Sequence, residues 1–181
     1  MAEYIAFLRA VNVGGRVFKM ADLRRCLEDA GHRQVETYIQ TGNVRFTTSA
    51  RSREKVERKL EELLTAAAGF EVPAVLFDPA ELKRLHDDVV RLPSPFGESE
   101  GHGRYLVLFK EADVPDPETS SAIEAWDRPG ESAKVVGRSV HIWLGHPTMQ
   151  ADFFGAFKKV LAPGTNRNLK VVRALAERWT S

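Results

Sequence analysis

Residues 35–48 read VETYIQTGNVRFTT, and this stretch decides the fold of the first half of the chain. Two β-prone runs, residues 35–40 and 44–48, flank the turn Thr41-Gly42-Asn43. Glycine and asparagine are favoured in tight turns because both tolerate a positive φ. The stretch therefore predicts a short antiparallel hairpin.

Outward from the hairpin, the apolar spacing predicts two helices and two more strands. Residues 4–11 and 72–77 are apolar and β-prone. Met20, Leu23 and Leu27 have helical spacing, and Ser52 is a predicted N-cap for a second helix. The order over residues 1–78 is βαββαβ, with helices at about 20–31 and 52–68. This is the ferredoxin-like arrangement, a four-stranded antiparallel sheet with two helices on one face.

A shorter and related pattern follows a Pro/Gly-rich linker at residues 93–103. It contains a strand at 105–110, a short helix at 117–126, a hairpin formed by residues 133–136 and 140–144, and two final helices. The predicted order is βαββαα, with a helix in place of a fourth strand. We therefore predict an α+β fold with subdomains at residues 1–92 and 104–181.

A polar loop follows the first strand at Arg9-Ala10-Val11-Asn12-Val13-Gly14-Gly15. Glycines let backbone N–H groups approach a ligand, and a nearby helix N-terminus favours an anion. The commoner meaning of a Gly-Gly pair is a simple turn, and the loop has neither the dinucleotide fingerprint nor the P-loop pattern. Arg9 offers a fork of donors for phosphate or carboxylate.

The ferredoxin-like order brings this loop to the turn of the hairpin, because the first strand pairs with the third. We expect Arg9, Asn12, Gly14 and Gly15 to lie beside Thr41, Gly42 and Asn43. The two asparagines suit a ligand site and a turn-stabilising role equally well. A third polar turn, with Thr165, Arg167 and Asn168, precedes the last helix, and Asn168 also suits its N-cap.

The net charge of +1 gives no reason to expect nucleic acid or an anionic membrane as a partner. The charge is uneven, since residues 158–181 carry six Lys or Arg and one Glu. A single cysteine, Cys26, allows no internal disulfide and favours the cytoplasm. No apolar stretch approaches the ~20 residues that span a bilayer, and residues 1–10 lack the pattern of a signal peptide.

The five histidines lack the spacing of metal ligands, so we interpret them as surface or incidental residues and expect no metal or cofactor. No catalytic triad, zinc-protease motif or nucleophile elbow is present. Cys26 falls within a predicted helix and is interpreted as a small core residue.

Three motifs carry a resemblance to the domain of unknown function family 1697, small bacterial proteins without an established activity. They are residues 8–15 with Met20 and Leu23, residues 37–46, and residues 165–171. In this chain Ala10 replaces the family's usual glycine, and Leu169 and Val171 replace its tryptophan and threonine. The resemblance implies a two-part ferredoxin-like fold and supplies no function.

From these features we expect a cytoplasmic protein that binds a small phosphate- or carboxylate-bearing ligand at a polar edge between the two subdomains. Two alternatives stay open, an enzyme of unknown reaction on such a ligand and a nucleic-acid or protein interaction module that uses the basic C-terminal segment. The sequence identifies no catalytic residue and leaves the oligomeric state open.

Overall fold

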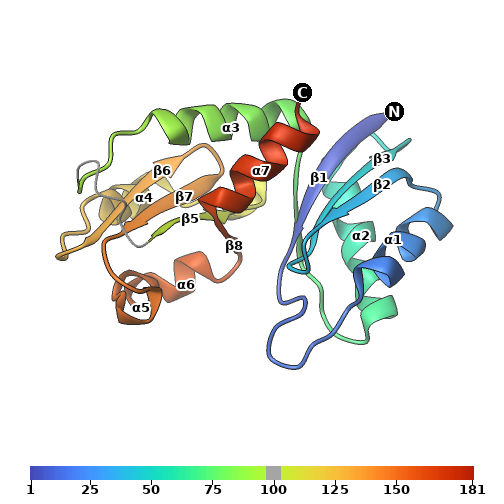
Figure 1. Ribbon diagram of the computed structural model, residues 1–181, viewed down its shortest axis with the longest axis horizontal. Coiled ribbons are helices and arrows are strands. Elements are labelled where there is room, and N and C mark those ends of the chain that lie inside the picture. The colour runs from blue at the N-terminus through green and yellow to red at the C-terminus, as the bar shows by residue number, and fades with distance from the viewer. Residues whose placement is uncertain (97–102) are drawn as a thin grey trace. The chain divides into compact units, whose positions relative to one another are not determined.

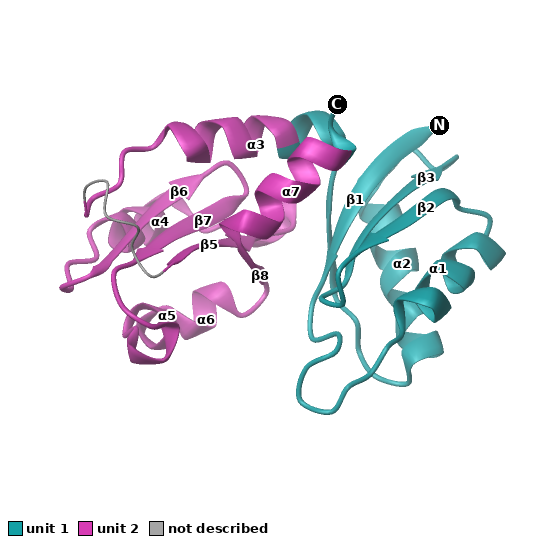
Figure 2. Ribbon diagram, in the orientation of Figure 1, with its two compact units in different colours: residues 1–82, 179–181 teal, residues 83–178 magenta. Residues whose placement is uncertain are grey.

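The computed structural model describes residues 1–96 and 103–181, and the chain divides into two compact units (Figures 1 and 2). Unit 1 comprises Met1–Leu82 and Trp179–Ser181, and unit 2 comprises Lys83–Arg178. The predicted linker at residues 93–103 includes residues 97–102, which lie outside the described residues. No helix in the described part of the chain is long and apolar enough to cross a membrane.

Unit 1 is the predicted βαββαβ half. Its elements are β1 (Ala2–Leu8), α1 (Met20–Asp29), β2 (Arg33–Tyr38), β3 (Asn43–Thr48), α2 (Arg53–Ala68), β4 (Ala74–Phe77) and the start of α3 (Pro79–Arg91). The antiparallel sheet has the strand order β2-β3-β1-β4, and α1 and α2 lie on one of its faces (Figure 1). The ferredoxin-like prediction for this half is confirmed.

The core of unit 1 forms where apolar side chains of the sheet meet those of the two helices. Ala6, Val44 and Phe46 from the strands are fully buried with Leu27 and Leu64 from the helices. Ser52 accepts a hydrogen bond from Lys55 N–H and starts α2 as predicted, and Gly69 ends it with φ +78°.

The two strands that border the predicted site are shifted from their predicted bounds. β1 ends at Leu8 and β2 at Tyr38, because Ala10 and Ile39 just beyond them have φ of +59° and +50°. Regular strand pairing is interrupted where a residue enters the left-handed region, and β2 contains one such interruption, a bulge at Gln34 with φ +52°. The residues that were predicted as the ends of these two strands belong instead to the loops that follow β1 and β2.

Unit 2 has a second four-stranded antiparallel sheet with the order β6-β7-β5-β8, the same topology as the first. Its elements are the rest of α3, β5 (Gly103–Leu108), η1 (Glu111–Asp113), α4 (Pro117–Glu124), β6 (Glu131–Val136), β7 (Ser139–Leu144), η2 (Thr148–Gln150), α5 (Phe153–Ala156), α6 (Lys158–Leu161), β8 (Thr165–Asn168) and α7 (Leu169–Trp179).

One element of unit 2 differs from the prediction. Residues 165–168, expected as a polar turn before a helix, form the fourth strand β8, which pairs with β5. The strand was missed because its sequence, TNRN, has no apolar residue and low β-propensity. The observed order is βαββ, then two short helices, then β8 and a final helix. The predicted order βαββαα did not include the strand before the final helix.

Candidate functional site

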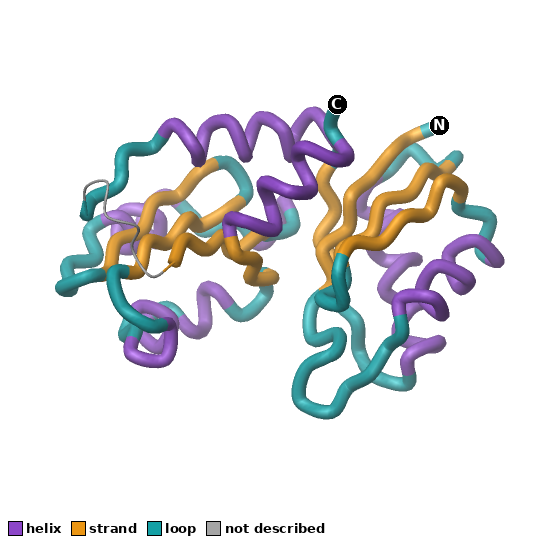
Figure 3. Tube along the Cα trace, viewed as in Figure 1, coloured by secondary structure: helices purple, strands orange, loops and turns teal. Residues whose placement is uncertain are grey.

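The loop at residues 9–19 extends from the end of β1 and is the long loop below that strand in Figures 1 and 3. At its tip, Arg16 N–H donates to Val13 O at 3.0 Å, and Gly14 and Gly15 have φ of +56° and +80°. Positive φ at both central residues is the signature of a two-residue hairpin turn. The positive φ expected for this glycine pair is confirmed. The pair forms an exposed hairpin tip, and α1 begins only at Met20.

Asn12 holds the base of this loop in place. Its Oδ1 accepts from Phe18 N–H at 2.8 Å, and its Nδ2 donates to Phe18 O at 3.1 Å and to Gln40 O at 2.6 Å. Its φ is +56°, a conformation that asparagine adopts more readily than most residues. The amide of Asn12 is thus bonded to backbone on both loops, which favours the turn-stabilising role.

The facing turn lies between β2 and β3, at the same edge of the sheet. Gly42 has φ +79° and its carbonyl accepts from Leu8 N–H at 2.8 Å. A Cβ on Gly42 would come within 2.9 Å of the Leu8 Cβ, so this position requires glycine. Asn43 is fully buried, and its Nδ2 donates to Tyr38 O and Thr41 Oγ1, both at 3.0 Å.

We call residues 9–19 together with residues 39–43 the loop edge of unit 1. The structure brings all seven site residues predicted in this half to that edge. Gly14, Gly15 and Thr41 are exposed, Arg9 is half-buried, and Gly42 and Asn43 are buried. Arg9 N–H donates to Pro73 O at 2.9 Å, which ties the start of the loop to the chain just before β4. The exposed part of the edge therefore presents backbone at the glycine pair, the guanidinium groups of half-buried Arg9 and exposed Arg16, and the ammonium group of exposed Lys19.

The remaining three predicted site residues lie on β8 in unit 2. Arg167 is 8% exposed, and its guanidinium donates to Thr165 Oγ1 at 3.0 Å and to Asn166 O at 2.8 Å. Burial lowers the pKa of Arg167 to about 10. Asn168 Oδ1 accepts from Lys170 N–H at 2.8 Å, so Asn168 caps α7. Leu169, at the family's tryptophan position, is buried.

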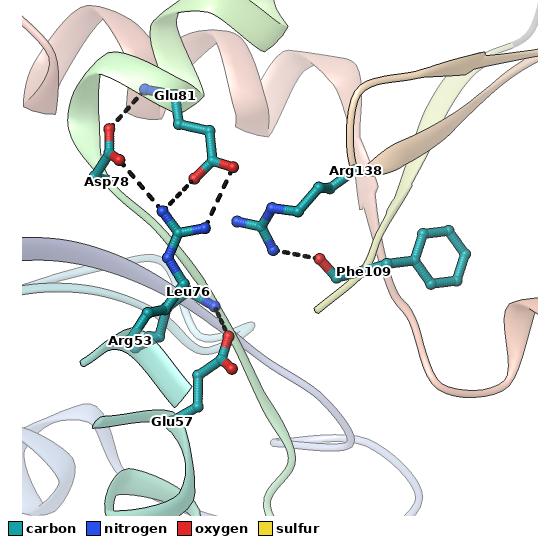
Figure 4. Close-up of polar contacts among 7 residues, drawn as sticks. All are labelled: Arg53, Glu57, Leu76, Asp78, Glu81, Phe109 and Arg138. Atoms are coloured by element: carbon teal, nitrogen blue, oxygen red, sulfur yellow. Dashed lines mark hydrogen bonds and ion pairs between the residues drawn. The ribbon is translucent and has the colours of Figure 1, made fainter. Parts of the chain in front are cut away.

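A cluster of carboxylates beside β4 was not predicted from the sequence (Figure 4). Glu57 of α2 accepts from Leu76 N–H at 3.1 Å, and Glu61 accepts from Ala74 N–H at 2.8 Å. These bonds satisfy outward N–H groups of an edge strand. Arg53 lies 3.3 Å from Asp78 Oδ2 and 3.0 Å from Glu81 Oε2. The cluster therefore fastens α2 to β4 and to the start of α3.

Figure 4 also shows Arg138 Nη1 donating to Phe109 O in unit 2, at 2.5 Å. This bond joins the β6–β7 turn to the residue that follows β5.

Of the five histidines, which we interpret from the sequence as surface or incidental residues, His141 is not at the surface, because it is fully buried on β7. The burial of His141 was not predicted because β7, with the sequence SVHIWL, is buried on both faces. Its sequence therefore has no alternation of polar and apolar residues that would assign His141 to a face. No three His, Cys, Asp or Glu side chains of the described ranges are grouped to hold a metal ion.

A shallow hollow of about 460 Å³ lies on α1 of unit 1, lined by Asp22, Arg25, Cys26, Asp29, Ala30 and Leu63. Cys26 packs against the core, as predicted, and burial and then the charge of Asp29 raise the pKa of its thiol. A raised pKa leaves less thiolate, so this cysteine is not activated for nucleophilic chemistry.

The comparisons with known proteins agree with this fold. A family model described as "Protein of unknown function (DUF1697)" matches residues 1–141, which include the first two motifs and end before the third. Among solved structures, the conserved bacterial protein SP0830 from Streptococcus pneumoniae is similar, with a TM-score of 0.80 and 19% identity. The match covers 100% of this chain and 99% of that one, and it shows a shared fold. No curated protein matches the sequence.

Proposed function

We propose, for a chain that belongs to the DUF1697 family of proteins of unknown function, that the loop edge of unit 1 binds a small ligand carrying a phosphate or carboxylate group. The proposal concerns binding, and it assigns no reaction.

The observation that carries the proposal is the concentration of backbone strain at this edge. Four non-glycine residues in the described ranges have a positive φ, and Ala10, Asn12 and Ile39 are three of them. For Ala10 and the β-branched Ile39 this conformation is unfavourable. Strained positions persist where the surrounding structure imposes them, and they cluster at ligand-binding sites.

The chemistry of the edge suggests the ligand class. Arg9 supplies a planar fork of donors that matches phosphate or carboxylate. The exposed tip at Gly14 and Gly15 leaves backbone open to close approach. Asn12 and Asn43 bond to backbone and neighbouring side chains, so in this proposal they position the two loops and do not contact the ligand.

Isothermal titration of the full-length protein with pyrophosphate and with citrate tests the proposal. Loss of a charged hydrogen-bonding partner costs about 1.5–3 kcal/mol, so Arg9→Gln should weaken binding at least tenfold. Arg58→Gln, at an exposed position on α2, is the matched control and should leave the affinity unchanged. Equal affinities for wild type and Arg9→Gln, or no binding of either probe at millimolar concentration, would overturn the proposal.

Arg167 of unit 2 stays a separate predicted ligand-binding residue, and Arg167→Gln in the same titrations tests it by itself. Its burial and the capping role of Asn168 also bear on the nucleic-acid alternative. Arg167 adds little to the exposed charge of the basic C-terminal segment, which weakens that alternative. Binding to nucleic acid would show a steep loss of affinity with added salt.

A further inference from the structure

The sheet of unit 2 has one apolar face and one basic face. Paired residues on adjacent antiparallel strands point to the same face. Lys134, His141, Leu106 and Arg167 therefore form one row across β6, β7, β5 and β8, and Ser132, Trp143 and Arg104 form the next. The opposite face holds the apolar core with Val107, Val140 and Ile142. None of the strand residues on the basic face is acidic.

His141 is at the centre of this face and is fully buried. Arg104 Nε–H donates to His141 Nε2 at 3.1 Å, so the imidazole carries its proton on Nδ1. Burial, together with the charge of Arg104, lowers the pKa of His141 to about 3. Among the described residues, His141 Nδ1 has no hydrogen-bond partner.

Trp143 presents a second donor of the same kind beside it. The His141 and Trp143 rings are 4.1 Å apart between centroids, and Trp143 is 5% exposed. Its Nε1 also lacks an acceptor in the described part of the chain. The chain's other two indoles each have one, since Trp126 donates to Glu131 at 2.8 Å and Trp179 to Glu36 at 3.1 Å. Buried donors nearly always have acceptors, so two adjacent exceptions require an explanation.

Two arginines, Arg104 and Arg173, add positive charge beside this pair of donors. The Arg104 guanidinium lies 5.5 Å from the centre of the Trp143 ring and donates to Val89 O of α3 at 2.9 Å. Burial and then the charge of Arg173 on α7 lower the pKa of Arg104. An acceptor bound beside these two rings would therefore be in a positive potential.

We propose that a small anion, a halide or a single carboxylate group, binds at His141 and Trp143 and accepts hydrogen bonds from His141 Nδ1–H and Trp143 Nε1–H. A water molecule is the competing occupant. A water would bring two hydrogens that need acceptors of their own, whereas the side chains described here offer donors. This site is in unit 2 and does not depend on the function proposed for unit 1.

The three indole N–H resonances of ¹⁵N-labelled protein provide the test, with Trp→Phe variants to assign them. The full-length protein is dialysed into HEPES at pH 7.5 free of halide and carboxylate, and then titrated with sodium chloride or with sodium formate. The Trp143 resonance should shift with saturation, or be replaced by a second signal, with one or both salts. Trp126 and Trp179, whose N–H groups already have acceptors, are internal controls and should not respond.

The two salts distinguish a halide site from a carboxylate site. If Trp143 responds no more than the two control indoles with either salt, the proposal is overturned. A long-lived water detected at the Trp143 indole and unaffected by both salts would also overturn it, in favour of a buried water.

A matched pair of arginine variants tests whether the charge of Arg104 contributes to binding of the anion. Arg104 and Arg128 each lie over a tryptophan ring, at 5.5 Å and 5.7 Å. Arg104→Gln should weaken the salt response of Trp143 at least tenfold, and Arg128→Gln and Arg9→Gln should leave it unchanged. Should Arg104→Gln fail to fold, the exposed Arg173→Gln removes charge without touching the buried contacts and should weaken the response several-fold. Unchanged responses in the folded variants of Arg104 and Arg173 would contradict the proposal.

Discussion

Asn12 Nδ2 lies 2.6 Å from Gln40 O, so a single side chain joins the loop after β1 to the turn before β3. The same side chain is bonded twice to Phe18. The geometry of the loop edge therefore depends on Asn12 more than on the glycine pair at its tip.

Replacement of Asn12 should destabilise unit 1 through two effects that two variants can separate, the loss of its side-chain hydrogen bonds and the cost of its positive φ. Asn12→Gly keeps the positive φ but leaves the half-buried Phe18 N–H without its acceptor, at an expected cost of about 1–3 kcal/mol. Asn12→Ala should cost about 1 kcal/mol more, because alanine disfavours the left-handed region. Urea unfolding measures both. Asn166→Ala, at an exposed position, is the control and should change stability by less than about 0.5 kcal/mol.

Ala10→Gly should stabilise the protein. Ala10 has φ +59° at a position where the related family usually has glycine, and the substitution relieves a conformational cost of about 1–2 kcal/mol. The greater backbone entropy of glycine in the unfolded chain offsets part of this gain, which leaves about 0.5–1 kcal/mol. Ala66→Gly, in the last turn of α2, should instead destabilise the protein, by up to about 1 kcal/mol. A loss of stability in Ala10→Gly would contradict the assigned conformation.

Two glycines of the loop edge should respond differently to alanine. Both have positive φ, but a Cβ on Gly14 has open space around it, whereas one on Gly42 meets the Leu8 Cβ at 2.9 Å. Gly14→Ala should cost about 1–2 kcal/mol from the backbone conformation alone. Gly42→Ala should cost about 1–3 kcal/mol more, because the clash displaces buried Leu8. Equal costs in a thermal melt would rule out close packing at Gly42.

The stability of the protein should fall below pH 6.5 because His141 is buried in its neutral form. Its pKa is lowered from 6.5 to about 3, so the unfolded chain takes up a proton that the folded chain does not. The loss begins near the unfolded pKa and grows until the pH reaches the folded pKa. At pH 5 it should amount to about 2 kcal/mol. Urea unfolding at pH 7.5 and pH 5 measures it, and His141→Gln should lack this part of the pH dependence.

Among the carboxylates of unit 2, Glu131 should be the one whose substitution lowers the stability most. It is buried and accepts hydrogen bonds from Trp126 Nε1–H, Asp152 N–H and Phe153 N–H at 2.7–2.9 Å. Burial alone raises its pKa, but these bonds outweigh burial and lower it. Glu131→Gln should cost about 2–4 kcal/mol at neutral pH. Glu124→Gln, which affects one exposed bond to Val135, should cost less than about 1 kcal/mol.

Because the pKa of Glu131 is lowered, its contribution to the free energy of unfolding should depend on pH. Its contribution is complete above the unfolded pKa near 4.5 and disappears as the pH falls through the lower folded value. The difference in unfolding free energy between wild type and Glu131→Gln should therefore shrink in acid. If that difference did not change with pH, the stabilisation would not depend on the negative charge of Glu131, and the prediction would be wrong.

The local sequence determined the elements of unit 1 and their order. A helix start such as Ser52, a helix end such as Gly69 and a turn such as Thr41-Gly42-Asn43 each act on a few neighbouring residues, and apolar periodicity assigns a face to each element. The topology then followed from the order βαββαβ, which is why the meeting of Asn12 with the 39–43 turn could be expected before any coordinates.

The tertiary structure decided what depends on partners distant in the chain. β8 is a strand because β5 supplies the other half of its hydrogen bonds, although TNRN has little tendency to be one. His141 is buried because Arg104 and Trp143 enclose it from neighbouring positions of the sheet, and the sequence SVHIWL does not distinguish that histidine from a surface one. Ala10 adopts a glycine's conformation because the loop is fixed at Arg9 and Asn12 on either side of it. Interactions within a segment are encoded in that segment, whereas burial, strain and donors without acceptors arise only when distant segments pack together.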